Sequence, residues 1–358
     1  MRGIDLFSGA GCGSAGTRHA GITMVGAVDA WDIAARTYAD NFPTAKVVTK
    51  RLKKGIGSEI FGDVRKIDIL IASPECTNHS IARGNRPVDE ESRRSGWYVM
   101  EFIRDWDPRW VVLENVTPMR HWPGFDELIT ELKRRYKLRI EPLDAADFGT
   151  PQNRRRLFIV GDNLNEPAIP KTTVRVERTA ASILSPVGTY GARPVFGEGR
   201  ARATLERVKR GIAALGKGRD FLIVYYGSDR AGGWQPLDRP LRTLTTLDRF
   251  GLVQWIGGEP TLRMLQVPEL KRAMGMQGLN DEHGRNVKFV LRHGTRRDQI
   301  KLLGNGVCAP VMRAVVGSLV GGGLSDILPR SSHSNAPGAS RSRRPAAVRR
   351  KTVPTKRG

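Results

Sequence analysis

The sequence predicts an α/β protein built on a doubly wound parallel sheet, followed by a small irregular region and a disordered tail. Short β-rich apolar runs alternate with helical patterns through the first half of the chain. A glycine-rich turn follows the first of these runs, and the apolar pattern weakens in the middle of the chain. In such a sheet, ligands bind at the carboxyl ends of the strands, where the loops gather.

Five apolar runs are expected to form strands, and three segments between them have helical spacing. We divide the chain into a first part of the main domain (1–162), a middle region (163–238), the remainder of the main domain (239–328) and a tail (329–358). The expected strands are Ile4–Phe7, Met24–Val28, Ile67–Ala72, Trp110–Leu113 and Leu157–Val160. The expected helices are Asp32–Asn41, Gly96–Trp106 and Phe125–Tyr136.

The charge of the chain favours a polyanionic partner. The 358 residues carry a formal net charge of +23, and nine of these positive charges lie in the tail, which contains no acid. A basic surface attracts phosphate backbones whatever their sequence. A merely soluble basic protein and an acidic membrane surface are the alternatives, but no basic amphipathic helix stands out. The tail also lacks the apolar residues that it would need to fold, so we expect it to be disordered.

Cysteine use and hydropathy predict a cytoplasmic protein, associated with the nucleoid. No apolar run approaches the length of a membrane span, and the first residues enter a strand pattern directly. The three cysteines, at positions 12, 76 and 308, are far apart and odd in number. That distribution suits a reducing compartment and predicts neither a disulfide framework nor a metal site.

The first expected strand runs into a turn that is rich in glycine, between Asp5 and Gly16. Glycines there let the backbone turn tightly and bring amide groups close to a ligand. The next strand ends in Asp29, where an acid commonly accepts hydrogen bonds from ribose hydroxyls, and Asp63 adds a further acid on a loop. The turn alone is compatible with a dinucleotide or with a structural role. Together with Asp29 it favours a cofactor that contains adenosine.

Cys76 follows the third expected strand in a Ser-Pro-Glu-Cys turn. Taken alone it is compatible with a small buried apolar residue at a strand end. Glu114 ends the next strand, where a carboxyl group of raised pKa could exchange a proton with a substrate. Arg154 and Arg156 alternate along the start of the last strand, so both can point to one face. These companions favour a catalytic role for Cys76.

Five short motifs, in order, resemble those of the cytosine-5 DNA methyltransferases. They span the chain from residue 3 to about residue 320. The resemblance implies a Rossmann-like methyltransferase sheet, S-adenosylmethionine as the cofactor, and a target-recognition domain in the middle region. The motifs are Asp5-Leu6-Phe7-Ser8-Gly9, Pro74-Glu75-Cys76, Glu114-Asn115-Val116, Gln152-Asn153-Arg154-Arg155-Arg156 and Gly304-Asn305-Gly306-Val307.

The resemblance also assigns roles to individual residues. Cys76 would add to carbon 6 of a cytosine flipped out of double-stranded DNA, and Glu114 would hydrogen-bond to ring nitrogen 3. Arg154 and Arg156 would hold the flipped base. The implied cofactor contacts are Phe7, Gly9, Gly11, Asp29, Asp63 and Asn305. The expected DNA contacts are Ser80 and Arg83 in the loop after Cys76, and Gln152 and Thr245 on either side of the middle region.

The sequence departs from the family pattern at three positions. Glu75 stands where proline is usual, and a carboxylate there should oppose thiolate formation at Cys76 unless it pairs with an arginine such as Arg83. Gly306 stands where serine is common, and Cys12 where glycine is common. A tRNA cytosine-5 methyltransferase, an enzyme that installs another carbon-5 group, and an inactive DNA-binding relative remain the alternatives. We expect a monomer, with a cognate restriction enzyme as a possible partner.

Overall fold

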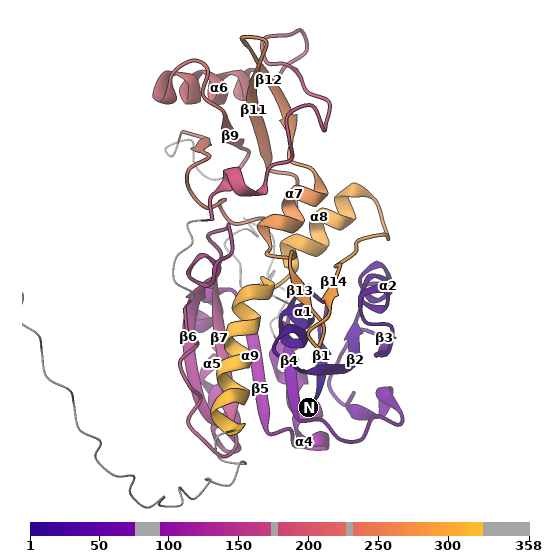
Figure 1. Cartoon of the computed structure of the whole chain (residues 1–358). Coiled ribbons are helices and arrows are strands. Elements are labelled where there is room, and N and C mark those ends of the chain that lie inside the picture. The colour runs from indigo at the N-terminus through magenta and orange to yellow at the C-terminus, as the bar shows by residue number, and fades with distance from the viewer. Residues whose placement is uncertain (76–93, 173–177, 227–231, 325–358) are drawn as a thin grey trace, which may run out of the picture.

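The computed structural model describes residues 1–75, 94–172, 178–226 and 232–324. These residues form a main lobe around a seven-stranded sheet and a second lobe around a five-stranded sheet (Figure 1). The second lobe lies beyond one end of the main sheet, with helices α7 and α8 between the two sheets. The predicted nucleophile Cys76, the predicted DNA contacts Ser80 and Arg83, and the tail from residue 329 all lie outside the described residues.

The main sheet is mostly parallel, and among its seven strands β7 runs antiparallel to both of its neighbours. The chain moves outward from β1 to β3 and then returns to the other side of β1 to form β4. This reversal opens a crevice at the carboxyl ends of β1 and β4. The strand order is β3 (Lys46–Thr49), β2 (Thr23–Asp29), β1 (Arg2–Leu6), β4 (Ile69–Ala72), β5 (Trp110–Asn115), β7 (Arg155–Asp162) and β6 (Lys137–Asp144).

Strand β4 shows how the sheet is covered on both faces. Ile69 and Ile71 point into one hydrophobic core, whereas Leu70 and Ala72 point into the other. The first core contains side chains of α1 (Cys12–His19), α2 (Asp32–Asn41) and α9 (Ala309–Leu324). The second contains side chains of α4 (Ser95–Trp106) and α5 (Phe125–Lys133). A parallel strand buried on both faces needs a continuous apolar run, which is the pattern that the sequence has here.

The apolar composition of α9 is explained by packing inside the main lobe. Residues Arg296–Gly321 are long and apolar enough to pass as a membrane span, yet 61% of their most apolar stretch is buried within the protein. Helix α9 lies along the sheet and contacts α1 (Figure 1). A Cβ atom on Gly16 of α1 would lie 2.3 Å from the backbone oxygen of Ala309, so the two helices touch backbone to backbone.

The expected fold class is confirmed, and the five expected strands correspond to β1, β2, β4, β5 and β7. The expected helices correspond to α2, α4 and α5, although α5 ends at Lys133 rather than at Tyr136. The two edge strands, β3 and β6, were not predicted, because their residues are only partly buried and mix polar with apolar side chains. Short 3₁₀ turns fill several connections: Ser58–Phe61, Thr117–His121, Ala145–Phe148 and Ala180–Ile183.

The second lobe is a regular antiparallel sheet covered by helix α6 (Arg202–Leu215). Phe221 and Ile223 of β9 face a small core that includes Val208 of α6, whereas Leu222 and Val224 join the first core of the main lobe. The two lobes therefore share a continuous hydrophobic interior. The strand order is β10 (Trp234–Pro236), β9 (Phe221–Val224), β11 (Phe250–Ile256), β12 (Glu259–Met264) and β8 (Arg193–Pro194).

The sequence-based boundary at residue 238 requires correction, and so does the expectation of an irregular middle region. Strands β11 and β12 lie beyond that boundary but pair with β9 and β8 of the second lobe. The two strands form a hairpin through Gly257 and Gly258, whose φ angles are 61° and 84°. Two glycines at positive φ suit a tight two-residue hairpin turn. Because 25 residues or more separate β9 and β11 in the chain, the sequence did not indicate that these two strands pair.

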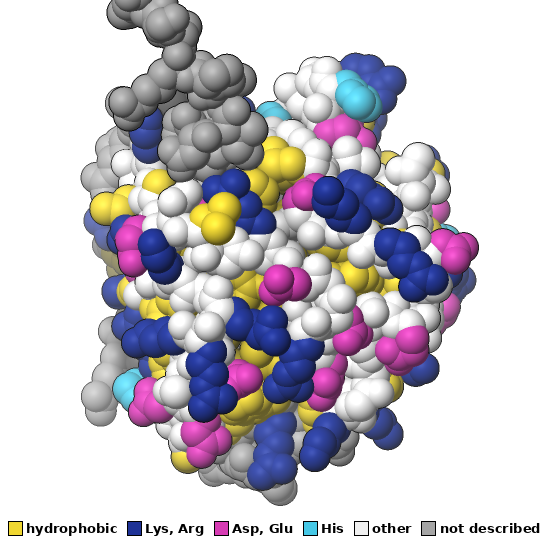
Figure 2. Space-filling view, turned by 90° about the horizontal axis from the view of Figure 1, so that it is seen from below, with side chains coloured by type: hydrophobic (Ala, Val, Ile, Leu, Met, Phe, Trp, Pro, Cys, Tyr) yellow, Lys and Arg dark blue, Asp and Glu magenta, His cyan; other side chains and the backbone are white. Residues whose placement is uncertain are grey.

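The remaining elements connect the second lobe back to the main lobe. Helix α7 (Val267–Ala273) begins with a capping box between Gln266 and Glu269. A small hairpin, β13 (Leu279–Asn280) and β14 (Asn286–Val287), comes next, followed by α8 (Arg296–Asn305). On the face of the molecule turned away from the second lobe, Lys and Arg side chains are interspersed with Asp and Glu (Figure 2). That face therefore does not offer a uniformly basic surface.

Candidate functional site

A cavity of about 470 Å³ lies at the carboxyl ends of the central strands of the main sheet. Its lining begins at Asp5 in β1 and ends at Met312 in α9, so both ends of the described chain contribute to it. The position is the one expected from the reversal of strand order between β1 and β4. Seven of the predicted site residues line this cavity: Phe7, Gly9, Asp29, Glu114, Arg154, Arg156 and Asn305.

The turn after β1 has an unusual backbone at the cavity wall. Phe7 adopts φ 58°, a left-handed conformation that is rare for a bulky side chain and is usually found where function requires it. The hydroxyl of Ser8 is buried and has no hydrogen-bond partner among the described residues. Nothing lies within 4 Å of the position that a Cβ atom on Gly9 would occupy. The turn thus leaves open space beside an unpaired hydroxyl.

Two acids at the ends of β1 and β2 face this space. The carboxylate of Asp29 accepts hydrogen bonds from the backbone amides of Gly9 and Trp31, each at 2.8 Å. Burial nevertheless raises the pKa of Asp29. Burial raises the pKa of Asp5 to about 8, although the Ser14 hydroxyl donates a 2.6 Å hydrogen bond to it. Asp5 is therefore mostly protonated at neutral pH.

The residues present fit an adenosine-containing cofactor. Asp29 can accept from ribose hydroxyls, Ser8 supplies an unpaired hydroxyl, and the ring of Phe7 offers an apolar face. Asn305, at the end of α8, closes the same cavity from a segment almost 300 residues away in the chain. A buried polar group without a partner costs free energy, which a bound ligand can recover.

Glu114 and Arg156 form the acidic and basic sides of the inner part of the cavity. The Glu114 side chain is 7% exposed, and Arg156 Nε lies 3.3 Å from its Oε1. Burial raises the pKa of Glu114, against the opposing effects of Arg156, Arg154 and a hydrogen bond from Ser73. A carboxyl group in this setting keeps its proton to higher pH than an exposed one and can donate a hydrogen bond.

Arg154 lines the cavity, but the prediction that it sits in the strand beside Arg156 needs correction. It precedes β7, and its guanidinium donates to the backbone oxygens of Leu244 (2.9 Å), Gly304 (2.7 Å) and Gly306 (2.9 Å). Its side chain is buried and cross-links the two segments that return from the second lobe. This geometry supports a positioning role for Arg154, with Arg156 nearer to Glu114.

The turn that precedes Cys76 is fixed to the strand that carries Glu114. Asn115 Nδ2 donates to the backbone oxygen of Pro74 at 3.2 Å, and Asn115 Oδ1 accepts from Val116 N at 2.8 Å. Pro74 and Glu75 both line the cavity, so the chain reaches it immediately before Cys76. Asn115 belongs to the Glu114-Asn115-Val116 motif, but no role was predicted for it from the sequence.

Glu75 forms an ion pair that the sequence did not predict. Arg51 Nη1 lies 2.6 Å from Glu75 Oε1, and both residues line the cavity. The prediction considered Arg83, which lies outside the described residues. An arginine at this distance compensates the carboxylate charge next to Cys76, the predicted nucleophile.

The departures at Cys12 and Gly306 are explained by a single contact. A Cβ atom on Gly306 would lie 2.7 Å from Cys12 Sγ and 2.9 Å from Cys12 Cβ. The buried side chain of Cys12 therefore occupies the space into which a serine at position 306 would project. The side chain at position 12 and the missing side chain at position 306 thus fit each other where α1 meets the end of α8.

Four predicted contacts lie away from the cavity in this structure. Gly11 packs against Tyr38 and Phe42, and its amide donates to Ser8 O, so it shapes the turn and does not face the cofactor space. Asp63 is exposed on a turn after the first 3₁₀ segment and does not line the cavity. Position in a loop, which the sequence shows, did not reveal which way that loop faces.

The two remaining predicted DNA contacts differ in accessibility. Gln152 is fully buried and cannot reach DNA. Its amide nitrogen donates to Ala273 O at 3.0 Å, and its amide oxygen accepts from Leu244 N at 2.8 Å. Thr245 is partly exposed, and its backbone lies against Gly304. Gln152 therefore holds the interior together, whereas Thr245 stays a predicted contact.

Several cavity residues were missed by the sequence analysis. Trp31 and Lys301 line the cavity together, with the Lys301 ammonium 4.2 Å from the ring centroid of Trp31. Arg51 follows β3, a strand that was itself missed. No local motif marks these residues, because their proximity arises from the fold of segments far apart in the chain. Ser8 and Asp5 belong to the first motif, but they were not predicted as site residues.

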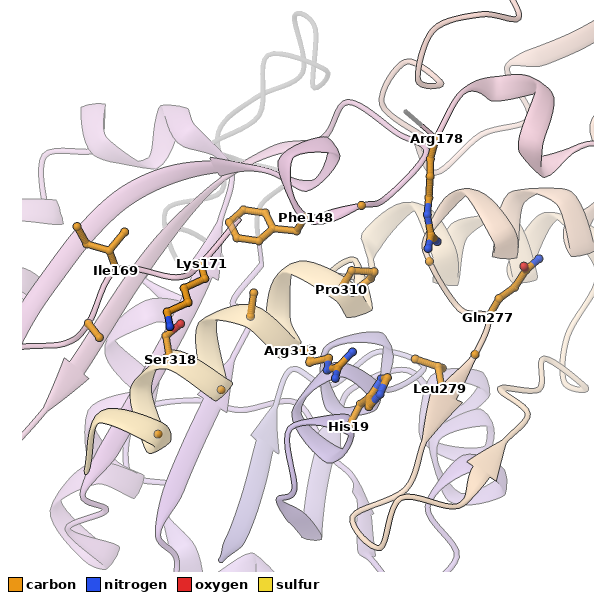
Figure 3. A pocket seen from close by; sticks show the side chains of 17 residues that line it. His19, Phe148, Ile169, Lys171, Arg178, Gln277, Leu279, Pro310, Arg313 and Ser318 are labelled. Atoms are coloured by element: carbon orange, nitrogen blue, oxygen red, sulfur yellow. The ribbon is translucent and has the colours of Figure 1, made fainter. Parts of the chain in front are cut away.

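A larger cavity of about 850 Å³ lies along α9, away from these residues (Figure 3). His19, Lys171, Arg178 and Arg313 line it together with small and apolar side chains. The described residues of its lining include no acid. Among these described residues it therefore has no carboxyl group comparable to Glu114 of the smaller cavity.

The family model for C-5 cytosine-specific DNA methylases matches residues 1–188. This match covers more than half of the chain. The chain belongs to the C-5 cytosine-specific DNA methylase family. Its relatives include the type II methyltransferase M.XorII of Xanthomonas oryzae pv. oryzae, 34% identical over 190 residues, which cover 48% of this chain and 43% of M.XorII. The type II methyltransferase M.HgiDI of Herpetosiphon aurantiacus is 28% identical over 261 residues, 68% of this chain and 80% of M.HgiDI.

Solved structures of methyltransferases share the fold of this chain. The Entamoeba histolytica methyltransferase EhMeth has a TM-score of 0.62 at 18% identity, with 92% of this chain and 99% of EhMeth covered. The S. pombe Dnmt2 methyltransferase has a TM-score of 0.55 at 16% identity, with coverage of 91% and 99%. The alignments with M.XorII and M.DdeI span less than half of those proteins' lengths. The residues matched by the family model include the first strands, the turn at the cavity and Glu114.

Proposed function

We infer that this protein transfers a methyl group from S-adenosylmethionine to carbon 5 of cytosine in double-stranded DNA. The observation that carries the proposal is that Glu114 and Arg156 line the same cavity as Phe7 and Asp29. The first two suit the base, and the last two suit a cofactor that contains adenosine. The same cavity is reached by the chain just before Cys76. Membership of the methylase family supports the same reaction.

The reaction requires activation of the cytosine ring, because carbon 5 is a poor nucleophile. In this proposal the Cys76 thiolate adds to carbon 6, and Glu114 donates a hydrogen bond to ring nitrogen 3 as negative charge develops there. The cofactor, when bound, supplies the methyl group to carbon 5. Loss of the carbon-5 proton to a base and elimination of the Cys76 thiolate then restore the aromatic ring.

Arg156 and Arg154 have separate tasks in this scheme. Arg156, 3.3 Å from Glu114, orients that carboxyl group and presents donors to the base. Arg154 holds the backbone at Leu244, Gly304 and Gly306, and so keeps the wall around Asn305 in place. Because the cavity lies inside the main lobe, the target base must leave the duplex to reach it.

The substrate is tested by incubating the purified protein with S-adenosylmethionine labelled in the methyl group, in separate reactions with mixed DNA and with tRNA. We expect label in DNA, and bisulfite sequencing of the product will identify the methylated cytosines. Label in tRNA with none in DNA would contradict the DNA assignment and support the tRNA alternative.

The nucleophile is tested with DNA that contains 5-fluorocytosine, from which the fluorine cannot leave as a cation. We expect the wild-type protein to form a stable covalent adduct on this DNA, detected by its retarded migration in a denaturing gel. The Cys76→Ser variant should form none. An adduct that persists in this variant would move the nucleophile to another residue.

A further inference from the structure

The Arg51–Glu75 ion pair lies across the mouth of the cavity. Arg51 follows β3 and Glu75 follows β4, and these two strands flank β2 and β1 in the sheet. Their ends are three strand spacings apart, about 14 Å. The 2.6 Å contact between the two side chains therefore spans the ends of β2 and β1, where Asp29 and Gly9 lie.

Electrostatics place the pair close to the proposed ribose site. Glu75 contributes to the raised pKa of Asp29, after the larger effect of burial, so the two carboxylates lie within electrostatic reach of each other. The side chain of Arg51 is 61% exposed and that of Glu75 is 35% exposed. The pair thus forms the rim of the cavity, with one side toward solvent and the other toward the interior.

The chemistry of the pair suits the adenosyl group of a nucleoside. The purine edge presents an amino group, which donates hydrogen bonds, beside a ring nitrogen, which accepts one. A carboxylate accepts and a guanidinium donates, so the two side chains offer the complementary set. An exposed ion pair adds little stability by itself, so a large effect of these side chains on ligand binding would be distinguishable from an effect on folding.

We propose that Arg51 and Glu75 are cofactor-binding residues that contact the adenosyl group over Asp29 and close the cavity above it. The proposal rests on the proposed function only for the identity of the cofactor. It takes the place of the contact predicted for Asp63, which does not line the cavity. Because Glu75 directly precedes Cys76, the filled cofactor site also restrains the start of the nucleophile turn.

The test is calorimetric titration of the full-length protein with S-adenosylhomocysteine, in the absence of DNA. We expect Arg51→Ala and Glu75→Ala each to weaken binding at least tenfold, and the double variant to weaken it by less than the product of the two effects. The control is Arg36→Ala, which removes an exposed ion pair to Asp32 of the same 2.6 Å length on α2, away from the cavity. It should bind like the wild type.

A second titration uses S-inosylhomocysteine, in which a carbonyl replaces the amino group of the purine. The wild type should discriminate against this ligand, and Glu75→Gln, a conservative change that preserves the fold, should reduce the discrimination at least fivefold. Affinities within twofold of the wild type for Arg51→Ala and Glu75→Ala, with unchanged discrimination in Glu75→Gln, would overturn the proposal.

The outcome is separable from that of the methylation assay. A wild-type protein that binds S-adenosylhomocysteine through Arg51 and Glu75, yet labels no DNA, would contradict the DNA substrate and leave this assignment standing. Labelled DNA together with unaffected binding in the variants would support the DNA substrate and contradict the assignment of Arg51 and Glu75 to cofactor binding. A wild-type protein that binds neither nucleoside would overturn this assignment.

Discussion

Asp5 links the cofactor cavity to the pH dependence of stability. Its carboxyl group holds its proton in the folded protein up to about pH 8, whereas the unfolded chain releases it near 3.8. Between these values the folded state binds more protons, so the free energy of unfolding falls as pH rises. The slope from this group is at most about 1.4 kcal/mol per pH unit.

Asp5→Asn should remove that contribution, because the amide cannot ionise but can still accept from Ser14. We expect the variant to gain stability over the wild type progressively from pH 5 to pH 8, measured by urea unfolding at each pH. Asp147→Asn, at an exposed position, is the control. A constant difference between Asp5→Asn and the wild type across this range would contradict the assignment.

Cys12 and Gly306 should behave as a coupled pair. Gly306→Ser introduces a side chain where Cys12 already lies, and overpacking of this kind costs about 1–3 kcal/mol. Cys12→Gly removes a buried side chain and leaves a space. In the double variant the serine fills that space, so its loss of stability should be at least about 1 kcal/mol smaller than the sum of the single losses.

Urea unfolding of the four proteins completes the cycle. Strict additivity would show that the two positions do not share this space. Titration with S-adenosylhomocysteine gives a second reading, because both residues line the cavity. Gly306→Ser should weaken that binding, and the double variant should recover it.

Helix α8 ends against the segment that returns from the second lobe. A Cβ atom on Gly304 would lie 2.3 Å from the backbone oxygen of Thr245, an atom that cannot move aside as a flexible side chain could. Gly304→Ala should therefore destabilise the protein by about 1–3 kcal/mol, although alanine favours a helix.

Gly317 in α9 provides the opposite case. Nothing lies within 4 Å of its Cβ position, so Gly317→Ala should stabilise the protein by about 1 kcal/mol through helix propensity alone. Thermal unfolding of both variants compares the two glycines directly. Equal shifts of Tm with the same sign would show that the approach of Thr245 to α8 does not restrain the chain.

The elements that could be predicted are those in which a single segment shows a clear apolar pattern. Strand β4 was predicted from its continuous apolar run, and helix α2 from apolar residues at helical spacing. Strands β3 and β6 lie at the edges, where one face meets solvent and the pattern is diluted by polar residues. Strand β11 pairs with β9 and strand β12 pairs with β8, and both of these partners are distant in the chain.

The site could be predicted where a short motif carries it, and not where the fold assembles it. Phe7, Asp29 and Glu114 each lie at or next to the carboxyl end of a strand, so their position at the cavity follows from the topology. Gln152 and Arg154 share a motif with Arg156, yet their side chains turn into the interior to bind backbone groups of segments about 90 residues or more away. No pattern within a motif reveals that direction.

The two lobes are joined by a buried ion pair between β12 and α7. Arg263 Nη1 and Nη2 each lie 2.8 Å from an oxygen of Glu269, which is fully buried. Glu269 also accepts from the amides of Gln266 and Ser185, and these bonds lower its pKa although burial acts in the opposite direction. One carboxylate thus fixes three segments around the connection between lobes.

Glu269→Gln would leave Arg263 buried without its counter-charge, and we expect a loss of about 3–5 kcal/mol in the free energy of unfolding. The control is Glu206→Gln, which breaks an exposed pair with Lys209 on α6 and should cost less than about 1 kcal/mol. Urea unfolding measures both. Losses of similar size would show that the buried pair adds no more than a surface contact.

The cavity draws its walls from Asp5 at one end and from Met312 at the other, with the second lobe inserted between them. During synthesis, the first strands leave the ribosome long before Asn305 and α9 do. The cavity therefore stays without its last wall until almost all of the described chain has been made. Long-range closure of this kind slows folding. It also means that an incomplete nascent chain holds no finished cavity, however far the sheet itself has formed.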